Sequence, residues 1–268
     1  MKLFCFVLSV FSLLFVGCGL EVVNYLSPPS NSYNTPTQTT GYDRCYFDFE
    51  TNEKQSSAGY TGTAVYYKIY NNYSTMASRN SSIDSLASST NETAAAKQMI
   101  ETYGYKELGT NNGTKSPLIG ATSTNQRVYI RLTNYYENTG KDFIAEIKYR
   151  NSSSSTSEWN YIGVPLRTGN RQTFDFARKE DQIADNSSVS SALTIAGAGT
   201  VVKNAVPTED EATSVGDVVY GTFSDADKNV WYVDMYAVAV GQDEYLTTFY
   251  SKVLHLGCVP IDASDDNN

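Results

Sequence analysis

Cys18 has the most specific chemical surroundings in the sequence. It follows an apolar run from Leu3 to Val16, and the small residue Gly17 stands directly before it. The run is shorter than the roughly 20 residues that a membrane-spanning helix needs, so it fits the hydrophobic part of a signal peptide. This lipobox pattern predicts a signal peptide over 1–17, cleavage after Gly17 and acylation of the Cys18 thiol, which holds a protein at a bilayer surface. The alternative is an ordinary secretory signal with a cysteine near its cleavage site by chance.

Two further cysteines remain after processing, because Cys5 leaves with the signal peptide and Cys18 carries lipid. Cys45 and Cys258 are then an even pair in an oxidising compartment, which predicts a disulfide between the first and last core strands. The alternative is a pair of buried thiols. A zinc site is disfavoured, because His255 is the only histidine and the sequence has no CxxC spacing.

Residues for catalysis or cofactor binding are sparse. His255 lies in an apolar strand-like segment, which is more typical of a partly exposed strand residue than of a general base. The sequence contains no GxSxG, HExxH, P-loop or strand-linked GxGxxG pattern. Pairs of carboxylates are available for glycoside hydrolysis, but their spacing selects none of them. We therefore expect a non-enzymatic protein without a cofactor.

Asp225, Asp227 and Asn229 have the DxDxN spacing that directs oxygen ligands at calcium. An EF-hand loop needs glycine at its sixth position and glutamate at its twelfth, where this chain has Val230 and Tyr236. Aspartate and asparagine also suit a polar turn between two strands. We favour the turn and keep the three residues as a weak metal candidate.

Charge and aromatic content limit the class of partner. The formal net charge is −9 and the sequence pI is about 4.7, so the chain lacks the basic face that nucleic-acid binding needs. The 21 tyrosines either form flat contact surfaces for proteins or sugars, or pack a pleated sheet. We expect packing for most of them, and Tyr66 and Tyr67 cannot share a patch because adjacent strand residues face opposite ways.

The elements that position these residues are mostly strands. Short β-branched and aromatic runs between turn residues predict strands over 45–49, 63–70, 128–133, 143–149, 161–166, 192–196, 218–223, 230–240 and 249–259. Residues 91–104 read as a helix, with Ala96, Met99, Ile100 and Tyr103 on one face, and 82–86 as a further helical turn. The predicted organisation is a lipidated flexible tether over 18–42, a β-sandwich over 43–261 with a helical insertion at about 74–108, and an acidic tail over 262–268.

The segments over 231–241 and 250–254 resemble the last two strands of a fibronectin type III domain, with an aromatic and an alanine on one strand and Tyr250-Ser251 opening the next. Residues 65–70 resemble its third strand. The loose lipobox and segments such as YYKIYNN, VYIRLTNY and MYAVAVG are similar to those of spirochaete lipoproteins of unassigned function. The resemblance implies a mainly β, immunoglobulin/fibronectin III-like sandwich and a lipid-anchored place in a bacterial cell envelope.

From these observations we expect a binding or adhesion module with a protein or glycan ligand. One alternative is a structural or assembly lipoprotein on the periplasmic side that binds another envelope protein. Another is a carbohydrate- or calcium-binding lectin-like domain. The sequence leaves the membrane leaflet open.

Overall fold

The computed structural model describes a large part of the region after the predicted anchor. The described residues are 25–40, 44–52, 59–88, 90–109, 117–132, 145–164, 192–195, 199–202, 216–221 and 230–262. Cys18, the signal peptide, the acidic tail beyond 262 and the candidate ligands Asp225, Asp227 and Asn229 lie outside them.

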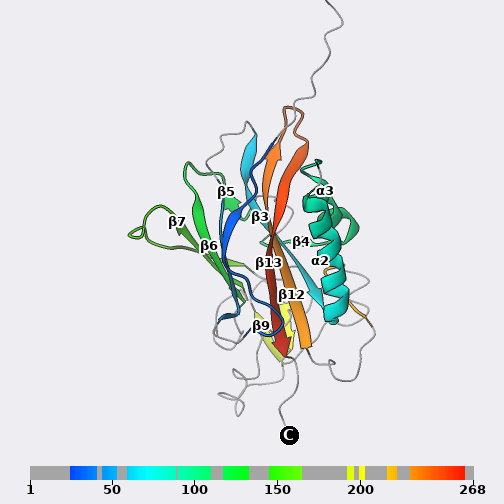
Figure 1. Ribbon diagram of the computed structural model, residues 1–268. Coiled ribbons are helices and arrows are strands. Elements are labelled where there is room, and N and C mark those ends of the chain that lie inside the picture. Colours follow the sequence, from blue (N-terminus) through cyan, green and yellow to red (C-terminus); the bar gives the residue numbers. More distant parts are fainter. Residues whose placement is uncertain are drawn as a thin grey trace, which may run out of the picture.

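One sheet, which we call sheet A, has five antiparallel strands in the order β1-β2-β6-β7-β8 (Figure 1). The strands are β1 (Ser30–Asn34), β2 (Tyr46–Glu50), β6 (Gln126–Leu132), β7 (Ala145–Asn151) and β8 (Asn160–Val164). Four of them, β2, β6, β7 and β8, overlap segments that the sequence predicts to be strands.

The second sheet, sheet B, has the strand order β11-β3-β12-β13. Its strands are β11 (Val218–Val219), β3 (Tyr60–Tyr70), β12 (Val230–Gln242) and β13 (Thr248–Asp262), with β4 (Lys106–Glu107) and β5 (Ile119–Gly120) also pairing with β3. All pairings are antiparallel except that of β11 with β3. A separate two-stranded sheet joins β9 (Ala192–Ile195) to β10 (Gly199–Val202).

The two large sheets pack face to face around one apolar core. Inward-facing residues of sheet A, such as Phe47 and Ile130, form one cluster with inward-facing residues of sheet B, such as Val65, Trp231 and Met235. Burial of this alternating apolar set removes a large apolar area from water and is the main source of stability. The protein is therefore mainly β, with largely antiparallel sheets in a sandwich-like arrangement.

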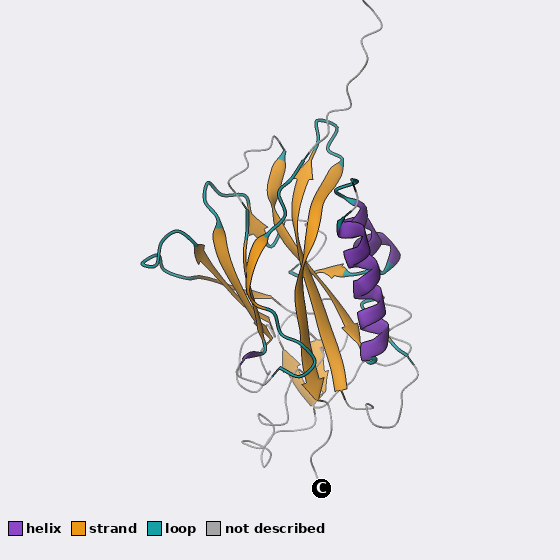
Figure 2. Ribbon diagram, viewed as in Figure 1, coloured by secondary structure: helices purple, strands orange, loops and turns teal. Residues whose placement is uncertain are grey.

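Helices cover the other face of sheet B (Figure 2). They are α2 (Tyr73–Ala87), α3 (Ala94–Lys97) and the π-helical turn η2 (Gln98–Thr102). The side chain of Asn72 caps α2 by accepting a hydrogen bond from the Thr75 amide at 2.9 Å. Met99 and the α2 residue Ile83 are fully buried against this face, so sheet B lies between two apolar layers. This explains why β3 and β12 are buried along nearly their whole length.

The predicted tether is wrong over its described part. Leu26 is only 2% exposed, and Ser30–Asn34 form strand β1 at the edge of sheet A. The Asn34 amide donates to the backbone carbonyls of Arg44 at 3.0 Å and Tyr46 at 2.5 Å. A composition rich in serine, asparagine and proline indicated a flexible segment, but backbone pairing and one amide side chain fix it to the fold.

The predicted disulfide is also absent. Both Cys45 and Cys258 are buried thiols, and no disulfide joins them. Cys45 belongs to the core between the sheets, whereas Cys258 belongs to the cluster under the helices, on the opposite face of sheet B. A disulfide needs a specific geometry between its two side chains, and here both cysteines remain thiols. Burial, with contributions from Asp234 and Cys45, raises the pKa of the Cys258 thiol to about 12.

None of the helices in the described segments has both the length and the apolar character that crossing a bilayer requires.

Candidate binding face

The outer face of sheet A carries a set of aromatic and charged side chains in mutual contact. Because Phe47 and Val128 point into the core, their strand neighbours Tyr46 and Asp48 on β2 and Arg127 and Tyr129 on β6 point outward. The register continues this face onto β7 and β8, since Tyr129 lies opposite Lys148 and Lys148 opposite Tyr161.

Five side chains on this face form a continuous series, which we call the aromatic–cation row: Tyr46, Tyr129, Lys148, Trp159 and Arg150. The rings of Tyr46 and Tyr129 stack with centroids 4.7 Å apart. Lys148 Nζ lies 4.3 Å from the Tyr129 ring and 5.3 Å from the Trp159 ring, and Arg150 Cζ lies 4.6 Å from the Trp159 ring. Such cation–π contacts restrict long side chains, and each exposed contact contributes an interaction free energy of about 0.5–1 kcal/mol.

Two exposed tyrosines flank the row. Tyr161 is 67% exposed and is paired in register with Lys148. Tyr33 is 50% exposed, and Arg127 Cζ lies 4.4 Å from its ring. The face therefore presents aromatic surface to solvent while its cations are already ordered by ring contacts.

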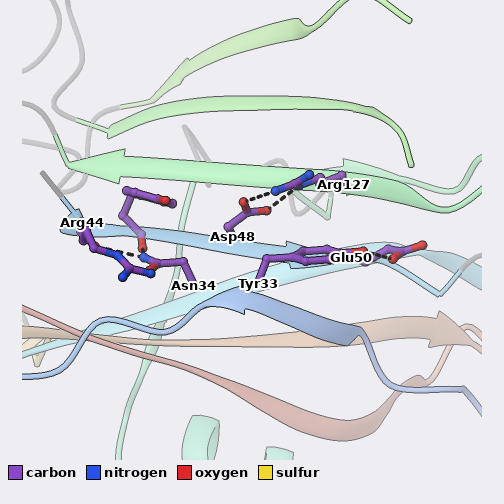
Figure 3. A network of polar contacts seen from close by, with 7 residues as sticks. Tyr33, Asn34, Arg44, Asp48, Glu50 and Arg127 are labelled. Carbon is purple, nitrogen blue, oxygen red and sulfur yellow. Dashed lines mark hydrogen bonds and ion pairs between the residues drawn. The ribbon is translucent and has the colours of Figure 1, made fainter. Parts of the chain in front are cut away.

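A bidentate ion pair between Arg127 and Asp48 lies on the same face (Figure 3). Arg127 donates from Nε to Asp48 Oδ1 at 3.0 Å and from Nη2 to Asp48 Oδ2 at 2.7 Å. The hydrogen bond to Asp48 raises the pKa of Arg127 further above its ordinary value. The Asp48 side chain is only 8% exposed, so Arg127 neutralises a carboxylate that water reaches poorly.

Glu50 is the second carboxylate on this side of β2, and it ties three segments together. It accepts hydrogen bonds from the Tyr33 hydroxyl at 2.9 Å, the Asn125 amide at 3.1 Å and the Ser152 hydroxyl at 2.7 Å. The bond to Glu50 is the main reason that the pKa of Tyr33 is raised (Figure 3). These bonds fix β1 and the turn after β7 to the end of β2, and thus hold Tyr33 and the row on one rigid surface.

A second polar cluster lies under the helices and is largely buried. His255 Nε2 lies 2.8 Å from Asp234 Oδ1, and the Asn80 amide donates to the same oxygen at 3.1 Å. The Tyr105 hydroxyl donates to Asp234 Oδ2 at 2.6 Å and accepts from the Tyr70 hydroxyl at 3.1 Å. The ring of Tyr236 stacks on His255 with centroids 4.5 Å apart.

Protonation of His255 is favoured by this cluster. Burial by itself lowers the pKa of the imidazole, but the nearby charge and hydrogen bond of Asp234 outweigh it and raise the pKa above 6.5. Burial also raises the pKa of Tyr105 and Tyr70, so both phenols stay protonated and can donate. The cluster joins α2, through Asn80, to strands β12 and β13, which suits a structural role.

His255 lies on strand β13, as the sequence predicts, and it contacts Asp234. The buried charge at position 234 in the apolar run of β12 is the signal that sequence reasoning did not use. Within the described segments, no group of three or more histidine, cysteine, aspartate or glutamate residues is placed to hold a metal ion.

Comparison with known family models, curated proteins and solved structures gave no match.

Proposed function

We propose that this protein is a lipid-anchored binding module of a bacterial cell envelope, and that it binds a protein partner through the outer face of sheet A. The observation that carries the proposal is the aromatic–cation row with exposed Tyr161 beside it. Tyrosine, tryptophan and arginine are the residues that most often dominate binding energy at protein interfaces.

The preordering of the face supports this role. Lys148 and Arg150 are held by rings, and the strands beneath are fixed by Glu50 and by the Asp48–Arg127 pair. A surface that is already ordered loses less side-chain entropy when a partner binds.

The strand order supports an immunoglobulin/fibronectin III-like sandwich as the scaffold. The series β1-β2-β6 and β3-β12-β13 correspond to the A-B-E and C-F-G orders of that fold. On this correspondence, β7 and β8 extend the A-B-E sheet, and the row lies across the extension. Within the described residues, the helices lie on sheet B and none covers the outer face of sheet A.

The anchor is a separate part of the proposal and rests on the sequence around Cys18. Cells that make the protein should incorporate an alkyne analogue of palmitate into it, and Cys18→Ser should abolish the labelling and release the protein from membranes. Labelling that persists in Cys18→Ser would overturn the assignment of this residue.

The binding face is tested by site-specific photo-crosslinking in the cells that make the protein. A photoreactive phenylalanine analogue replaces either Tyr161 or Ser78, an exposed residue of α2 on the far side of sheet B. We expect a discrete crosslink to one protein from position 161 and none from position 78. Trp159→Ala should weaken the crosslink at 161, with the protein still folded by circular dichroism.

Two outcomes would contradict the binding face. Equal crosslinking from 161 and 78 would mean a nonspecific contact, and no crosslink from 161 in cells that retain the anchored protein would remove the face as a partner site. Protease treatment of intact cells, with a periplasmic protein as leakage control, then separates an external partner from an internal one. Loss of the protein while the control survives indicates the outside.

A further inference from the structure

The turn between β12 and β13 exposes two large apolar residues side by side. Tyr245 is 80% exposed and Leu246 is 76% exposed, the two highest values for large hydrophobic side chains among the described residues. An isolated exposed tyrosine or leucine is ordinary, but an adjacent pair at the tip of a long hairpin indicates a contact surface.

Hydrogen bonds and an unusual backbone conformation hold this turn in place. Asp243 Oδ1 accepts from the amides of Tyr245 at 2.9 Å and Thr247 at 2.7 Å, and the Leu246 amide donates to the Asp243 carbonyl at 3.0 Å. Leu246 has a φ of 61°, the only positive φ at a non-glycine residue in the described chain. Glycine or asparagine would adopt this conformation at lower cost, so the turn holds Leu246 in a backbone region that leucine rarely occupies.

The described part of the chain begins at the same end of the sandwich as this turn (Figure 1). Ser30 pairs with Glu50 at the end of β2, and the Gln242 amide at the hairpin donates to the carbonyl of Gly59, where the chain returns toward β3. Tyr25, which is 45% exposed, lies seven positions after Cys18 in the sequence, and the residues between them are few. They span at most about 25 Å when extended, so an anchored Cys18 keeps this end of the domain near the bilayer.

We propose that the hairpin tip, with Tyr245 and Leu246, rests in the headgroup region of the membrane that holds the lipid anchor. Tyrosine and leucine suit that region, where a ring keeps its hydroxyl wet and an aliphatic side chain reaches the acyl boundary. Asp243 and Glu244 lie in the same turn, which favours zwitterionic over anionic lipid. The contact would hold the sandwich upright, with sheet A accessible. This inference rests on the proposed anchoring at Cys18.

The test uses the mature lipidated protein in phosphatidylcholine vesicles. Cys45 and Cys258 are buried, so a cysteine introduced by Leu246→Cys takes an environment-sensitive fluorophore selectively. Tyr161→Cys, at an exposed tyrosine on sheet A, is the matched control. We expect lipids with a quencher near the headgroup to cause a large loss of fluorescence at 246 and none at 161.

The outcomes separate this inference from the proposed function. Protein that floats with the vesicles but shows no quenching at 246 would overturn the hairpin contact and leave the anchor intact. Protein that does not float would remove the anchor, and the contact with it. Quenching at 161 as strong as at 246 would mean that the sandwich lies flat, which contradicts the hairpin contact and the accessible face together.

Discussion

The His255 imidazole and the Asp234 carboxylate face each other across two paired strands, with Nε2 and Oδ1 2.8 Å apart. A shift of register between Met235 and Tyr236 places His255 opposite Tyr236. From there the imidazole reaches the Asp234 carboxylate, two residues before Tyr236 on the same strand. Asp234 is fully buried, so this contact and the bonds from Asn80 and Tyr105 satisfy a charge that water cannot reach.

Asp234→Asn should lower the free energy of unfolding by about 1–3 kcal/mol, because three donors lose a charged acceptor in a buried site. Urea denaturation followed by circular dichroism measures the change. A variant as stable as the parent would mean that the cluster contributes nothing to holding the helices on sheet B.

The same cluster predicts a pH dependence. The pKa of His255 is raised in the folded state, so its stabilising contribution is complete below about 6.5 and is lost as pH rises through the folded-state pKa. The free energy of unfolding should therefore fall between pH 6 and 8, and His255→Gln should remove most of that fall. Burial raises the pKa of nearby Asp84 as well, which acts in the same direction at lower pH, so Asp84→Asn is the control. A slope that His255→Gln leaves unchanged would contradict the assignment.

Gly257 fixes the segment before β2 to the edge of sheet B. Its φ is +102°, and a Cβ there would lie 2.3 Å from the Pro36 carbonyl oxygen, which accepts the Cys258 amide. Gly257→Ala should cost at least about 2 kcal/mol of unfolding free energy. Gly120→Ala, where a Cβ meets nothing within 4 Å, should change it by no more than about 0.5 kcal/mol. Equal effects would mean that residues 35–36 are not docked on β13.

Arg127 and Arg150 differ in what they support, although both lie on the outer face of sheet A. Arg127→Met leaves the Asp48 carboxylate without its bidentate partner and should cost about 1–3 kcal/mol. Among the described residues, Arg150 makes only an exposed hydrogen bond to the Ser155 carbonyl and its contact with Trp159, so Arg150→Met should cost about 0.5 kcal/mol or less. Thermal denaturation of both variants measures the two losses of stability. An equal loss of stability in the two variants would contradict the supporting role of the Asp48–Arg127 pair.

Cys45 and Cys258 should both be detected as thiols by a thiol reagent once the protein is unfolded. In the mature protein, a thiol reagent should react with neither Cys45 nor Cys258 while the protein is folded, because both are buried. Both should react after unfolding without a reductant. Failure to detect thiols in the unfolded protein would show that a disulfide forms after all.

Much of the β architecture could be predicted, because strands of half-buried sheets carry their own pattern. β6 alternates strictly between buried and partly exposed residues, and the sequence segment over 128–133 predicts it. Tyr66 and Tyr67 do lie in different clusters on opposite faces of sheet B, as strand geometry requires. Ala96 and Met99 pack their predicted face on sheet B.

The features that the sequence did not predict depend on contacts between residues far apart in the chain. β1 has no apolar alternation that would predict a strand. Its pairing with β2 and the hydrogen bonds of Asn34 hold it in place instead. Trp159 lies just before β8, outside any strand pattern, and only the register of β7 and β8 brings it onto Lys148 and Arg150. Asp234 and His255 are 21 residues apart, and antiparallel pairing joins them.

The central claim, that a protein partner covers the outer face of sheet A, is tested most directly by hydroxyl-radical footprinting. Oxidation of each tyrosine and tryptophan is compared between intact cells and the purified lipidated protein, with Tyr220, which lies away from the row, as the internal reference. We predict that Trp159 and Tyr161 are oxidised much less in cells than after purification, while Tyr220 changes little. Equal oxidation of Trp159 and Tyr161 in the two preparations would contradict the account.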